Sequence, residues 1–393
     1  MLDFFYLISR TLLFYLMLFK LRRKRQRIRV LFLVSELSKW KSQFIYDLLE
    51  KSSDFEPVVA VTQLSSVHNG KDPTRDDLDK NYCFFKSKFM NAVKAYDNGH
   101  FLDLRAFSPD IVFYQQPWNL SKIQHPKAVS KFALTFYIPY YLNCYNVVTI
   151  DYNLEFHKYL FRYYVLNKEW ESIYRKKMGN NVVGLGHPFL DYFSVEGNFD
   201  SKYVIYAPHY SFSHEKNINP VNYGTFLDYG FVILNYAKMH PEFKWLFKPH
   251  PQLKSSLYKI GWSFDKIEHY YQEWESIGLA CYDFDYVDYF LNSRVLITDC
   301  SSFLMEYLCT KKPIIHLINC DCKIEPLENS KKIFDTFYKV HDKSDLLKYL
   351  DEILINNDDY LFDSRIKVLD ECGFLGLNSS LNILNDLKSL LKR

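Results

Sequence analysis

The sequence predicts an α/β protein built from two Rossmann-like domains of similar size, and three observations lead to this prediction. The chain has 393 residues, more than one ordinary hydrophobic core covers. Short apolar runs alternate with helical patterns along its length, which is typical of parallel α/β architecture. Hydrophobic residues make up 48% of the chain and charged residues 24%, proportions that indicate a folded enzyme rather than a disordered protein.

The amino-terminal half contains the first series of strands and helices. A helix is expected after the first strand, because Trp40, Phe44 and Leu48 recur at i, i+4 and i+8. The polar stretch 63–80 is expected to be a surface loop. Buried strands are expected at residues 30–35 (VLFLVS), 57–62 (PVVAVT) and 110–114 (DIVFY), and a strand that runs into a loop at 134–141 (LTFYIPYY).

The alternation of apolar runs with helical patterns restarts in the carboxyl-terminal half. We place the crossing between the two domains at 182–188 (VVGLGHP) and the polar residues that follow it in the sequence. Strands are expected at 203–209 (YVIYAPH), 243–251 (FKWLFKPHP), 295–300 (VLITDC) and 313–318 (PIIHLI), and helices at 223–240 and 342–393. The expected division is an amino-terminal helix with a basic collar at 1–29, a first domain at 30–195 and a second at 196–393. Two such domains facing each other across a cleft form the GT-B arrangement.

The amino-terminal segment carries most of the positive charge. Residues 1–29 hold eight Lys and Arg against the single acid Asp3, a net +7, so the remaining chain carries −4 of the total of +3. A mildly acidic body with one basic collar argues against a nucleic-acid-binding protein, which spreads positive charge over a folded face.

Residues 4–19 (FFYLISRTLLFYLMLF) precede the basic collar, the reverse of the order in a secretory signal, and no small-residue cleavage site follows them. The run is short for a span and contains Arg10. We expect a helix that lies in the membrane or barely crosses it, with the collar at anionic headgroups and residues 20 onward on the cytoplasmic side. The alternative is a buried helix with a solvated run of charges.

The eight cysteines include no Cys-x-x-Cys pair. Cys320 and Cys322 form the tightest cluster, but no His or Cys pair follows at zinc-binding spacing. Reduced thiols in a cytosolic compartment are therefore expected, with no bound metal.

Polar side chains follow three of the strands expected in the second half, where ligands bind to open parallel sheets. A histidine follows the first of these strands, a lysine and a histidine follow the second, and an aspartate and two serines follow the third. These residues are His209, Lys248, His250, Asp299, Ser301 and Ser302.

Each of these side chains has a role and a simpler alternative. Ser301 and Ser302 begin a helix whose open N–H groups hold a diphosphate, although simple capping also explains them. Lys248 offers a charge to phosphate oxygens, or is a solvated lysine at a strand end. His250, between two prolines, accepts a proton from an attacking hydroxyl, or bonds to a loop carbonyl. Glu306, one turn into the helix, accepts from ribose hydroxyls.

Three blocks in this region, YVIYAPHYSF, FKPHP and LITDCSSFLMEYLCTKKPIIHL, resemble the CDP-glycerol glycerophosphotransferase family of teichoic-acid primases and polymerases. The resemblance covers about Tyr203 to Leu317. It implies a GT-B fold with an amino-terminal acceptor domain and a carboxyl-terminal domain for a CDP-polyol donor, no further cofactor, and a lipid-linked or polymer acceptor. The acceptor hydroxyl attacks the β-phosphate and CMP leaves. His250 matches the family's carboxyl-terminal catalytic histidine, and Ser301 with Ser302 its pyrophosphate-binding turn. Asp299, in the same block, is expected to contact the donor.

The sequence departs from the family at a second histidine, which usually stands in a His-Gly-Thr-Pro-like loop of the first domain. This chain has no His-Gly dipeptide, and the corresponding place is Tyr137–Tyr141. We hypothesise that His209 supplies the missing imidazole. Lys248, the helix N-terminus and one protonated histidine would then neutralise the departing CMP phosphate, while the other histidine acts as base.

Two rival functions remain at this point. A nucleotide-sugar glycosyltransferase of the same fold uses the same cleft, and the Asp283–Asp285 stretch (DFD) superficially resembles a metal-binding motif, although it reads as the lead into a helix. A non-catalytic, membrane-bound partner in polymer assembly is the second rival. The pairing of KPHP with TDCSS favours phosphotransfer.

Overall fold

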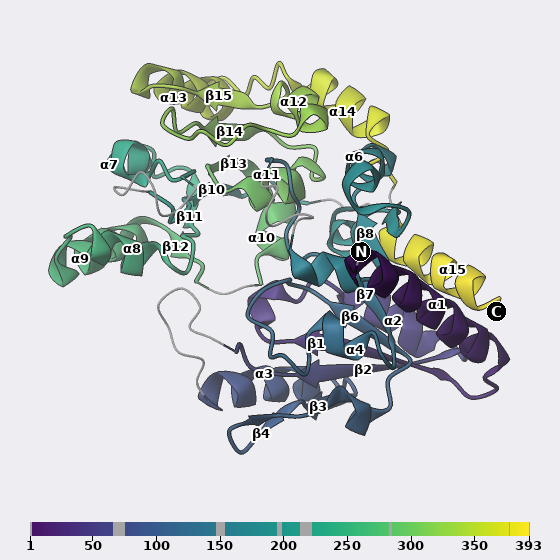
Figure 1. Ribbon diagram of the computed structural model, residues 1–393. Coiled ribbons are helices and arrows are strands. Elements are labelled where there is room, and N and C mark those ends of the chain that lie inside the picture. Colours follow the sequence, from purple (N-terminus) through teal and green to yellow (C-terminus); the bar gives the residue numbers. More distant parts are fainter. Residues whose placement is uncertain are drawn as a thin grey trace. The chain divides into compact units, whose positions relative to one another are not determined.

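The computed structural model describes residues 2–65, 75–146, 154–194, 199–212, 222–282, 285–376 and 378–392. The chain forms two compact units (Figure 1). Unit 1 comprises Met1–Tyr141, Val148–Asp191 and Leu377–Arg393, and unit 2 comprises Leu142–Val147 and Tyr192–Gly376. Each unit contains a parallel sheet with helices packed on it, which confirms the α/β class.

The sheet of unit 1 has the strand order β3-β2-β1-β6-β7-β8-β9, and all its neighbouring strands pair in parallel. The order reverses between β1 and β6, which makes their carboxyl ends the topological switch point of this sheet. The strands are β1 (Ile28–Val34), β2 (Phe55–Val61), β3 (Ala92–Lys94), β6 (Ile111–Tyr114), β7 (Leu134–Tyr137), β8 (Arg162–Val165) and β9 (Val182–Gly184).

The remaining elements of unit 1 are helices and one small hairpin. The helices are α1 (Leu2–Arg23), α2 (Gln43–Lys51), α3 (Arg75–Ser87), α4 (Pro126–Val129), α6 (Lys168–Met178) and α15 (Ser379–Leu391). Strands β4 (Tyr96–Asp97) and β5 (His100–Phe101) form the hairpin. Short 3-10 helices lie at η1 (Leu37–Lys39), η2 (Leu104–Phe107), η3 (Glu155–Tyr159) and η4 (Pro188–Phe193).

The sheet of unit 2 has the order β12-β11-β10-β13-β14-β15, again all parallel, and its switch point lies between β10 and β13. The strands are β10 (Tyr203–Ala207), β11 (Lys244–Phe247), β12 (Leu279–Ala280), β13 (Ser293–Thr298), β14 (Ile314–Leu317) and β15 (Tyr338–Val340). The helices are α7 (Phe226–Met239), α8 (Leu253–Lys259), α9 (Phe264–Ile277), α10 (Val287–Leu291), α11 (Ser301–Leu308), α12 (Glu328–Phe334), α13 (Lys343–Leu350) and α14 (Phe362–Glu371), with a π-helical turn at Asp351–Ile355.

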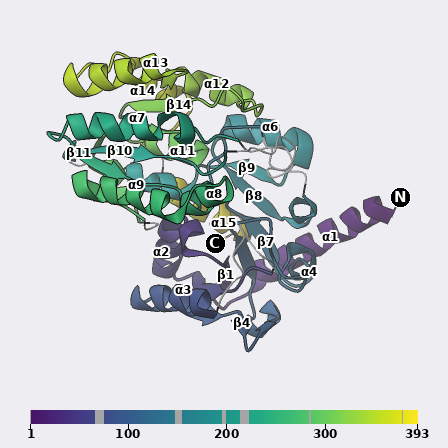
Figure 2. The same ribbon diagram turned by 90° about the vertical axis from the view of Figure 1, so that its left-hand side faces the viewer.

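Aromatic side chains form the centre of the unit 2 core, where α7 and α9 pack on β10 and β11 (Figure 2). Phe247 and Trp274 stack with 5.1 Å between their ring centroids and 10° between their planes. Tyr206 and Trp245 contact the same indole. Fully burying one such ring contributes about 1.5–3 kcal/mol, so this cluster anchors the strands whose ends carry the site.

Several expected elements differ from those observed. The stretch 63–80 was expected to be a loop, but α3 begins at Arg75, while residues 66–74 lie outside the described part of the chain. The expected crossing at 182–188 contains β9, the edge strand of the first sheet. The buried face of α2 consists of Ile45, Tyr46 and Leu49, one position away from the expected Phe44 and Leu48.

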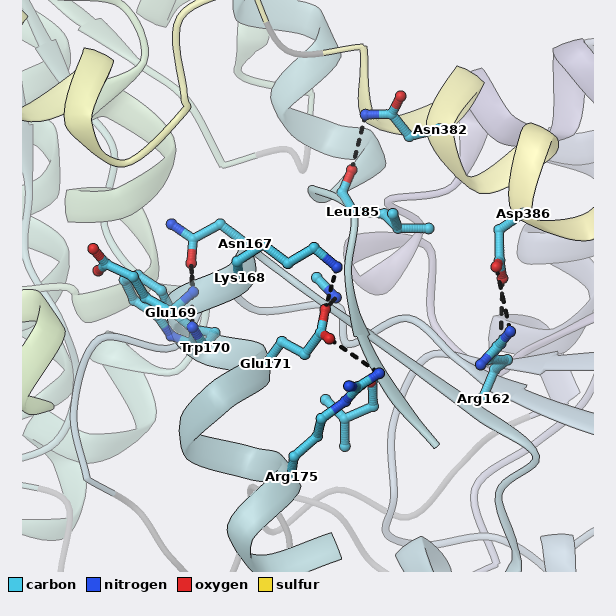
Figure 3. Close-up of polar contacts among 12 residues, drawn as sticks. Arg162, Asn167, Lys168, Glu169, Trp170, Glu171, Arg175, Leu185, Asn382 and Asp386 are labelled. Carbon is cyan, nitrogen blue, oxygen red and sulfur yellow. Dashed lines mark hydrogen bonds and ion pairs between the residues drawn. The ribbon is translucent and has the colours of Figure 1, made fainter. Parts of the chain in front are cut away.

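The carboxyl-terminal helix α15, which the sequence placed with the second domain, packs in unit 1. Asp191 accepts the Ser379 N–H at 2.7 Å and the Ser380 N–H at 2.8 Å, and so satisfies open amides at the helix start. Asp386 pairs with Arg162, as Figure 3 shows, and accepts the Tyr164 hydroxyl at 2.8 Å. Hydrophobic periodicity alone could not predict that α15 packs in unit 1, because periodicity does not indicate which sheet a helix covers.

Helix α1 carries apolar side chains on two opposite faces. Phe14, Leu18 and Leu21 are buried in unit 1, and the Phe14 ring lies 5.4 Å from that of Phe161. Leu12 and Leu16 on the other face are 59% exposed. Within the described residues, no helix is both long and apolar enough to cross a membrane.

We predict that Asp191→Ala lowers the free energy of unfolding by about 1–3 kcal/mol, because two amide donors at the start of α15 lose their buried acceptor. Urea denaturation followed by circular dichroism measures this change. Asp200→Ala serves as the control, since the Asp200 side chain forms an exposed ion pair with Lys202 and its removal should leave the midpoint unchanged. Equal midpoints for the Asp191 variant and the wild type would contradict the proposed anchoring of α15.

Candidate active site

The predicted site residues of the second half gather at the carboxyl edge of the unit 2 sheet, around its switch point. His209 lies two residues beyond the end of β10, and Asp299 directly follows β13. Lys248 directly follows β11, the neighbour of β10, and His250 lies two residues further on. Because ligands bind to open α/β sheets where the strand order reverses, the position itself indicates a binding site.

His209 and His250 lie face to edge, with 5.1 Å between their ring centroids. The loops that carry them are joined by a hydrogen bond of 3.0 Å from the His250 N–H to the Pro208 carbonyl. Tyr210 packs against both imidazoles, at 4.6 Å from His209 and 4.4 Å from His250. The structure therefore brings together the two histidines that the sequence placed on different strands.

Both imidazoles have their Nδ1 atoms occupied by donors from their own loops. The Gln252 N–H donates to His250 Nδ1 at 3.1 Å. The Ser211 N–H donates to His209 Nδ1 at 3.3 Å, and the Ser211 hydroxyl lies 2.7 Å from the same atom. A neutral imidazole whose Nδ1 accepts carries its proton on Nε2. Each ring is thus a neutral N–H donor, a role different from the general base that the sequence suggested for His250.

Burial keeps both rings neutral. It lowers the pKa of His209 to about 3. It also lowers the pKa of His250 well below its usual 6.5, and the charges of a protonated His209 and of Lys248 act in the same direction. The protonated histidine expected from the sequence is therefore disfavoured at neutral pH, and the positive charge at this edge resides on the Lys248 ammonium.

Asp299 binds two neighbouring loops of the protein itself. Its carboxylate accepts the His209 N–H at 2.6 Å, the Thr225 N–H at 2.6 Å and the Thr225 hydroxyl at 2.8 Å. Burial raises the pKa of Asp299 to about 6, against the opposing effect of these three donors. Asp299 thus positions the His209 loop and the start of α7, a contribution that differs from the donor contact expected from the sequence.

Lys248 and Glu306 lie on either side of one tyrosine. The Lys248 Nζ atom is 5.0 Å from the centre of the Tyr286 ring, within the range of a cation–π interaction. The Tyr286 hydroxyl donates to the Glu306 carboxylate, which is 1% exposed. Glu306 is therefore engaged inside the unit, and its contact with ribose stays a prediction.

Ser301 and Ser302 begin α11, and neither of them caps it. Cys300 occupies the N-cap position without a side-chain cap bond, so both serines lie in the first helical turn and are half-buried. The 3.5 Å contact between Cys300 Sγ and the Ser302 hydroxyl is weak. A helix start that its own side chains leave uncapped presents N–H groups and the positive end of the helix dipole to an anion.

A buried histidine that the sequence did not single out lies in unit 1. His187 Nε2 is 2.6 Å from the Pro139 carbonyl, within the Tyr137–Tyr141 stretch that corresponds to the family's histidine loop. Its Nδ1 accepts the Phe189 N–H at 3.2 Å, and burial lowers its pKa to about 4. The sequence could have pointed to His187, because this histidine stands in a Gly-His-Pro stretch directly after a short strand. Of the Asp283–Asp285 stretch, residues 283 and 284 lie outside the described residues.

Comparison with known proteins gives the fold and the family separately. The structure is similar to UDP-GlcNAc 2-epimerase from Neisseria meningitidis (TM-score 0.58, 13% identity, covering 92% of this chain and 100% of that one). It is also similar to a variant of the wall teichoic acid polymerase TagF (TM-score 0.57, 13% identity, covering 94% and 91%). Identities this low show the fold alone, which confirms a GT-B-like fold built from two Rossmann-like units. A search of curated proteins found no match.

The family comes from the sequence of unit 2. Residues 196–323 match the model of the family described as CDP-Glycerol:Poly(glycerophosphate) glycerophosphotransferase. The matched stretch contains His209, Lys248, His250, Asp299, Ser301, Ser302 and Glu306, so the family assignment and the site geometry concern the same edge of the same sheet. Epimerases and transferases share this fold, and the family match is what separates them. Residues 196–323, about a third of the chain, are thus similar to the CDP-glycerol glycerophosphotransferase family.

Proposed function

We propose that the protein transfers glycerol phosphate, or a related polyol phosphate, from a CDP-activated donor to a hydroxyl of a membrane-linked surface polymer, with release of CMP. The observation that carries the proposal is the pair of neutral Nε2 donors on His209 and His250, beside the Lys248 ammonium and the α11 N-terminus. All of these groups stabilise negative charge, and a nucleotide diphosphate is the negative charge that this family's donors carry. We propose that these groups act without a metal ion or another cofactor.

The reaction is a displacement at phosphorus. The acceptor oxygen forms a bond to the β-phosphorus of the donor, the bond from that phosphorus to the bridging oxygen breaks, and the electron pair leaves with CMP. The acceptor proton passes to solvent. Phosphoryl transfer demands mainly positioning and charge stabilisation, because its transition state is loose. Two N–H donors and one ammonium therefore supply what the step requires, even though neither imidazole is arranged as a base.

Rigid placement of these donors follows from the contacts around them. Asp299 holds the His209 backbone, and Pro208 accepts from the His250 backbone, so the two rings keep their separation without help from a ligand. Preorganised donors stabilise a transition state more than mobile ones, since no reorganisation accompanies the reaction.

We further propose that α1 attaches the protein to the cytoplasmic face of an anionic membrane. The exposed side chains Leu12, Tyr15, Leu16 and Phe19 recur at i, i+3, i+4 and i+7, so they line one face of the helix. The basic collar of Lys20, Arg22, Arg23, Arg25 and Arg27 follows that face directly. In Figure 2 the amino-terminal end of α1 extends away from the other elements of unit 1. A helix with an apolar face and adjoining cations binds in the plane of an anionic bilayer.

The overall proposal is tested by measuring nucleotide release from CDP-glycerol, CDP-ribitol and a set of nucleotide sugars, in the presence of a lipid-linked acceptor. We expect CMP release from a CDP-polyol alone. Turnover confined to a nucleotide sugar would instead identify a glycosyltransferase, and CDP-glycerol binding without CMP release would identify a non-catalytic partner.

We predict that His250→Ala lowers kcat by about 10²–10³, the effect of removing one preorganised donor from a charged transition state. His250→Gln should recover part of that loss, because a glutamine amide can place an N–H near the position of Nε2. His240→Ala, at the far end of α7, is the matched control and should be fully active. A Gln variant as slow as the Ala variant would contradict the donor role, and an unchanged His209→Ala enzyme would remove His209 from the site.

The pH profile of kcat/KM should show one acid limb, with a midpoint at about 6, that belongs to Asp299 and not to a histidine. Because burial raises the pKa of Asp299 to about 6, its carboxylate is ionised above that pH and loses acceptor strength below it. The histidines stay neutral through the same range, since burial lowers their pKa values. The limb should therefore persist in His250→Gln, and its disappearance there would show that His250 itself titrates.

We predict that the double substitution Leu12→Glu with Leu16→Glu weakens binding to vesicles containing phosphatidylglycerol by at least about tenfold, since burying each leucine contributes about 1.5–3 kcal/mol. Flotation through a density gradient measures the bound fraction. Phe89→Glu is the control, because Phe89 is 95% exposed and lies two residues beyond the end of α3. Equal flotation of the double variant and the wild type would remove α1 from the membrane contact.

A further inference from the structure

A second cluster of polar groups lies at the switch point of the other sheet, that of unit 1. Gln115 and Gln116 directly follow β6, and each is 4% exposed. Among the residues that the structure describes, Gln115 Nε2 and Gln116 Oε1 have no hydrogen-bond partner. Leaving a buried polar group unpaired costs about 1–3 kcal/mol, so native proteins retain few of them without a reason.

A buried cation lies beside these amides. Lys39, in the η1 turn that follows β1, is 5% exposed and forms an ion pair with Glu36. Its Nζ atom lies 5.2 Å from the centre of the Tyr140 ring and 5.9 Å from that of Trp118. The residues beyond β1 and those beyond β6 therefore meet at the point where the strand order of this sheet reverses, as in the donor half of the chain.

Backbone hydrogen bonds tie the amides to the same aromatic residues. The Gln116 side-chain amide donates to the Trp118 carbonyl at 2.9 Å. The Tyr140 N–H donates to the Gln115 carbonyl at 2.9 Å. The amides, the ammonium and the aromatic rings are thus neighbours in one cluster, although they come from loops after three different strands.

The aromatic rings form a wall of this cluster. Trp118 and Tyr141 lie 6.2 Å apart with 24° between their planes, and Trp118 meets Tyr140 edge to face at 5.9 Å. The indole Nε1 of Trp118 is also buried and lacks a partner within the described residues. Aromatic faces pack against the C–H groups of sugars and polyols, while indole and amide groups bond to hydroxyls.

We propose that this cluster, made of Lys39, Gln115, Gln116, Trp118 and Tyr140, binds the phosphate-bearing polyol or sugar at the end of the acceptor. The unpaired amide and indole atoms take the hydroxyls of the acceptor, and the Lys39 ammonium takes its phosphate. The identity of the ligand as the acceptor rests on the proposed function, whereas the existence of a polar binding site rests on the orphaned atoms alone.

Substituting leucine for Gln115 distinguishes a binding site from a structural network. Leucine has a volume similar to that of glutamine and removes an amide nitrogen, Nε2, that has no partner in the described residues, so the folded state should lose little stability. If the amide were instead part of a satisfied core network, the same change would destabilise the protein. The thermal midpoint therefore separates the two explanations before any ligand is added.

The test uses the full chain with glycerol phosphate as the probe, observed by ligand-detected NMR, with glycerol and inorganic phosphate as separate arms. We expect glycerol phosphate to bind more tightly than either fragment, and Gln115→Leu and Lys39→Met each to weaken it at least about fivefold. Asn181→Leu is the matched control, because Asn181 lies at the opposite, amino-terminal edge of the same sheet and should leave binding unchanged.

Binding of CDP-glycerol is measured in parallel on the same variants, because it reports the site of unit 2. Unchanged CDP-glycerol binding with weakened glycerol phosphate binding supports the inference. Equal glycerol phosphate binding by wild type and Gln115→Leu, or a lower thermal midpoint for that variant, overturns it and leaves the proposed function intact. Failure of the wild type to bind CDP-glycerol would overturn the proposed function, while the glycerol phosphate comparison would still decide the inference.

Discussion

One buried carboxylate determines the geometry of the candidate site in unit 2. Asp299 is 2% exposed and satisfies three donors, one from the loop after β10 and two from the residue that precedes α7. Its own position is set by β13, the strand beside β10 at the switch point. The His209 ring, and through the contact of His209 with His250 the whole imidazole pair, depends on this carboxylate staying ionised in a dry environment. A positioning residue of this kind explains why the site needs no ligand to hold its shape.

The sequence predicted the fold class well because parallel sheets give a strong local signal. Buried strands such as β1, β2, β10 and β13 are continuous apolar runs with polar residues at their ends, and periodicity identifies such runs. Short strands were missed for the opposite reason. β9 has three residues and β12 two, too few to show a pattern, and α3 was hidden by its polar composition. The place of α15 in unit 1 depends on tertiary contacts alone.

The candidate site was predictable in its location but not in its chemistry. Strand ends and the Lys-Pro-His-Pro motif placed Lys248 and His250 at a carboxyl edge, where the structure has them. The amino-acid sequence does not show that the backbone N–H groups of Gln252 and Ser211 donate to the two imidazoles. It also does not show that burial keeps both imidazoles neutral. Asp299 was expected to contact the donor, since a sequence cannot tell an internal acceptor from an external one. The role of His187, and the unpaired Gln115 Nε2 and Gln116 Oε1 atoms within the described residues, become visible only once their neighbours are known.

The return of α15 to unit 1 has a consequence for how the chain is made. Residues 379–391 are synthesised after all of unit 2, yet Asp191 and Arg162, which bind them, are synthesised before it. During translation, all the helices and strands of unit 2 are therefore synthesised before helix α15 of unit 1. A nascent or prematurely terminated chain therefore exposes the surface of unit 1 that α15 covers.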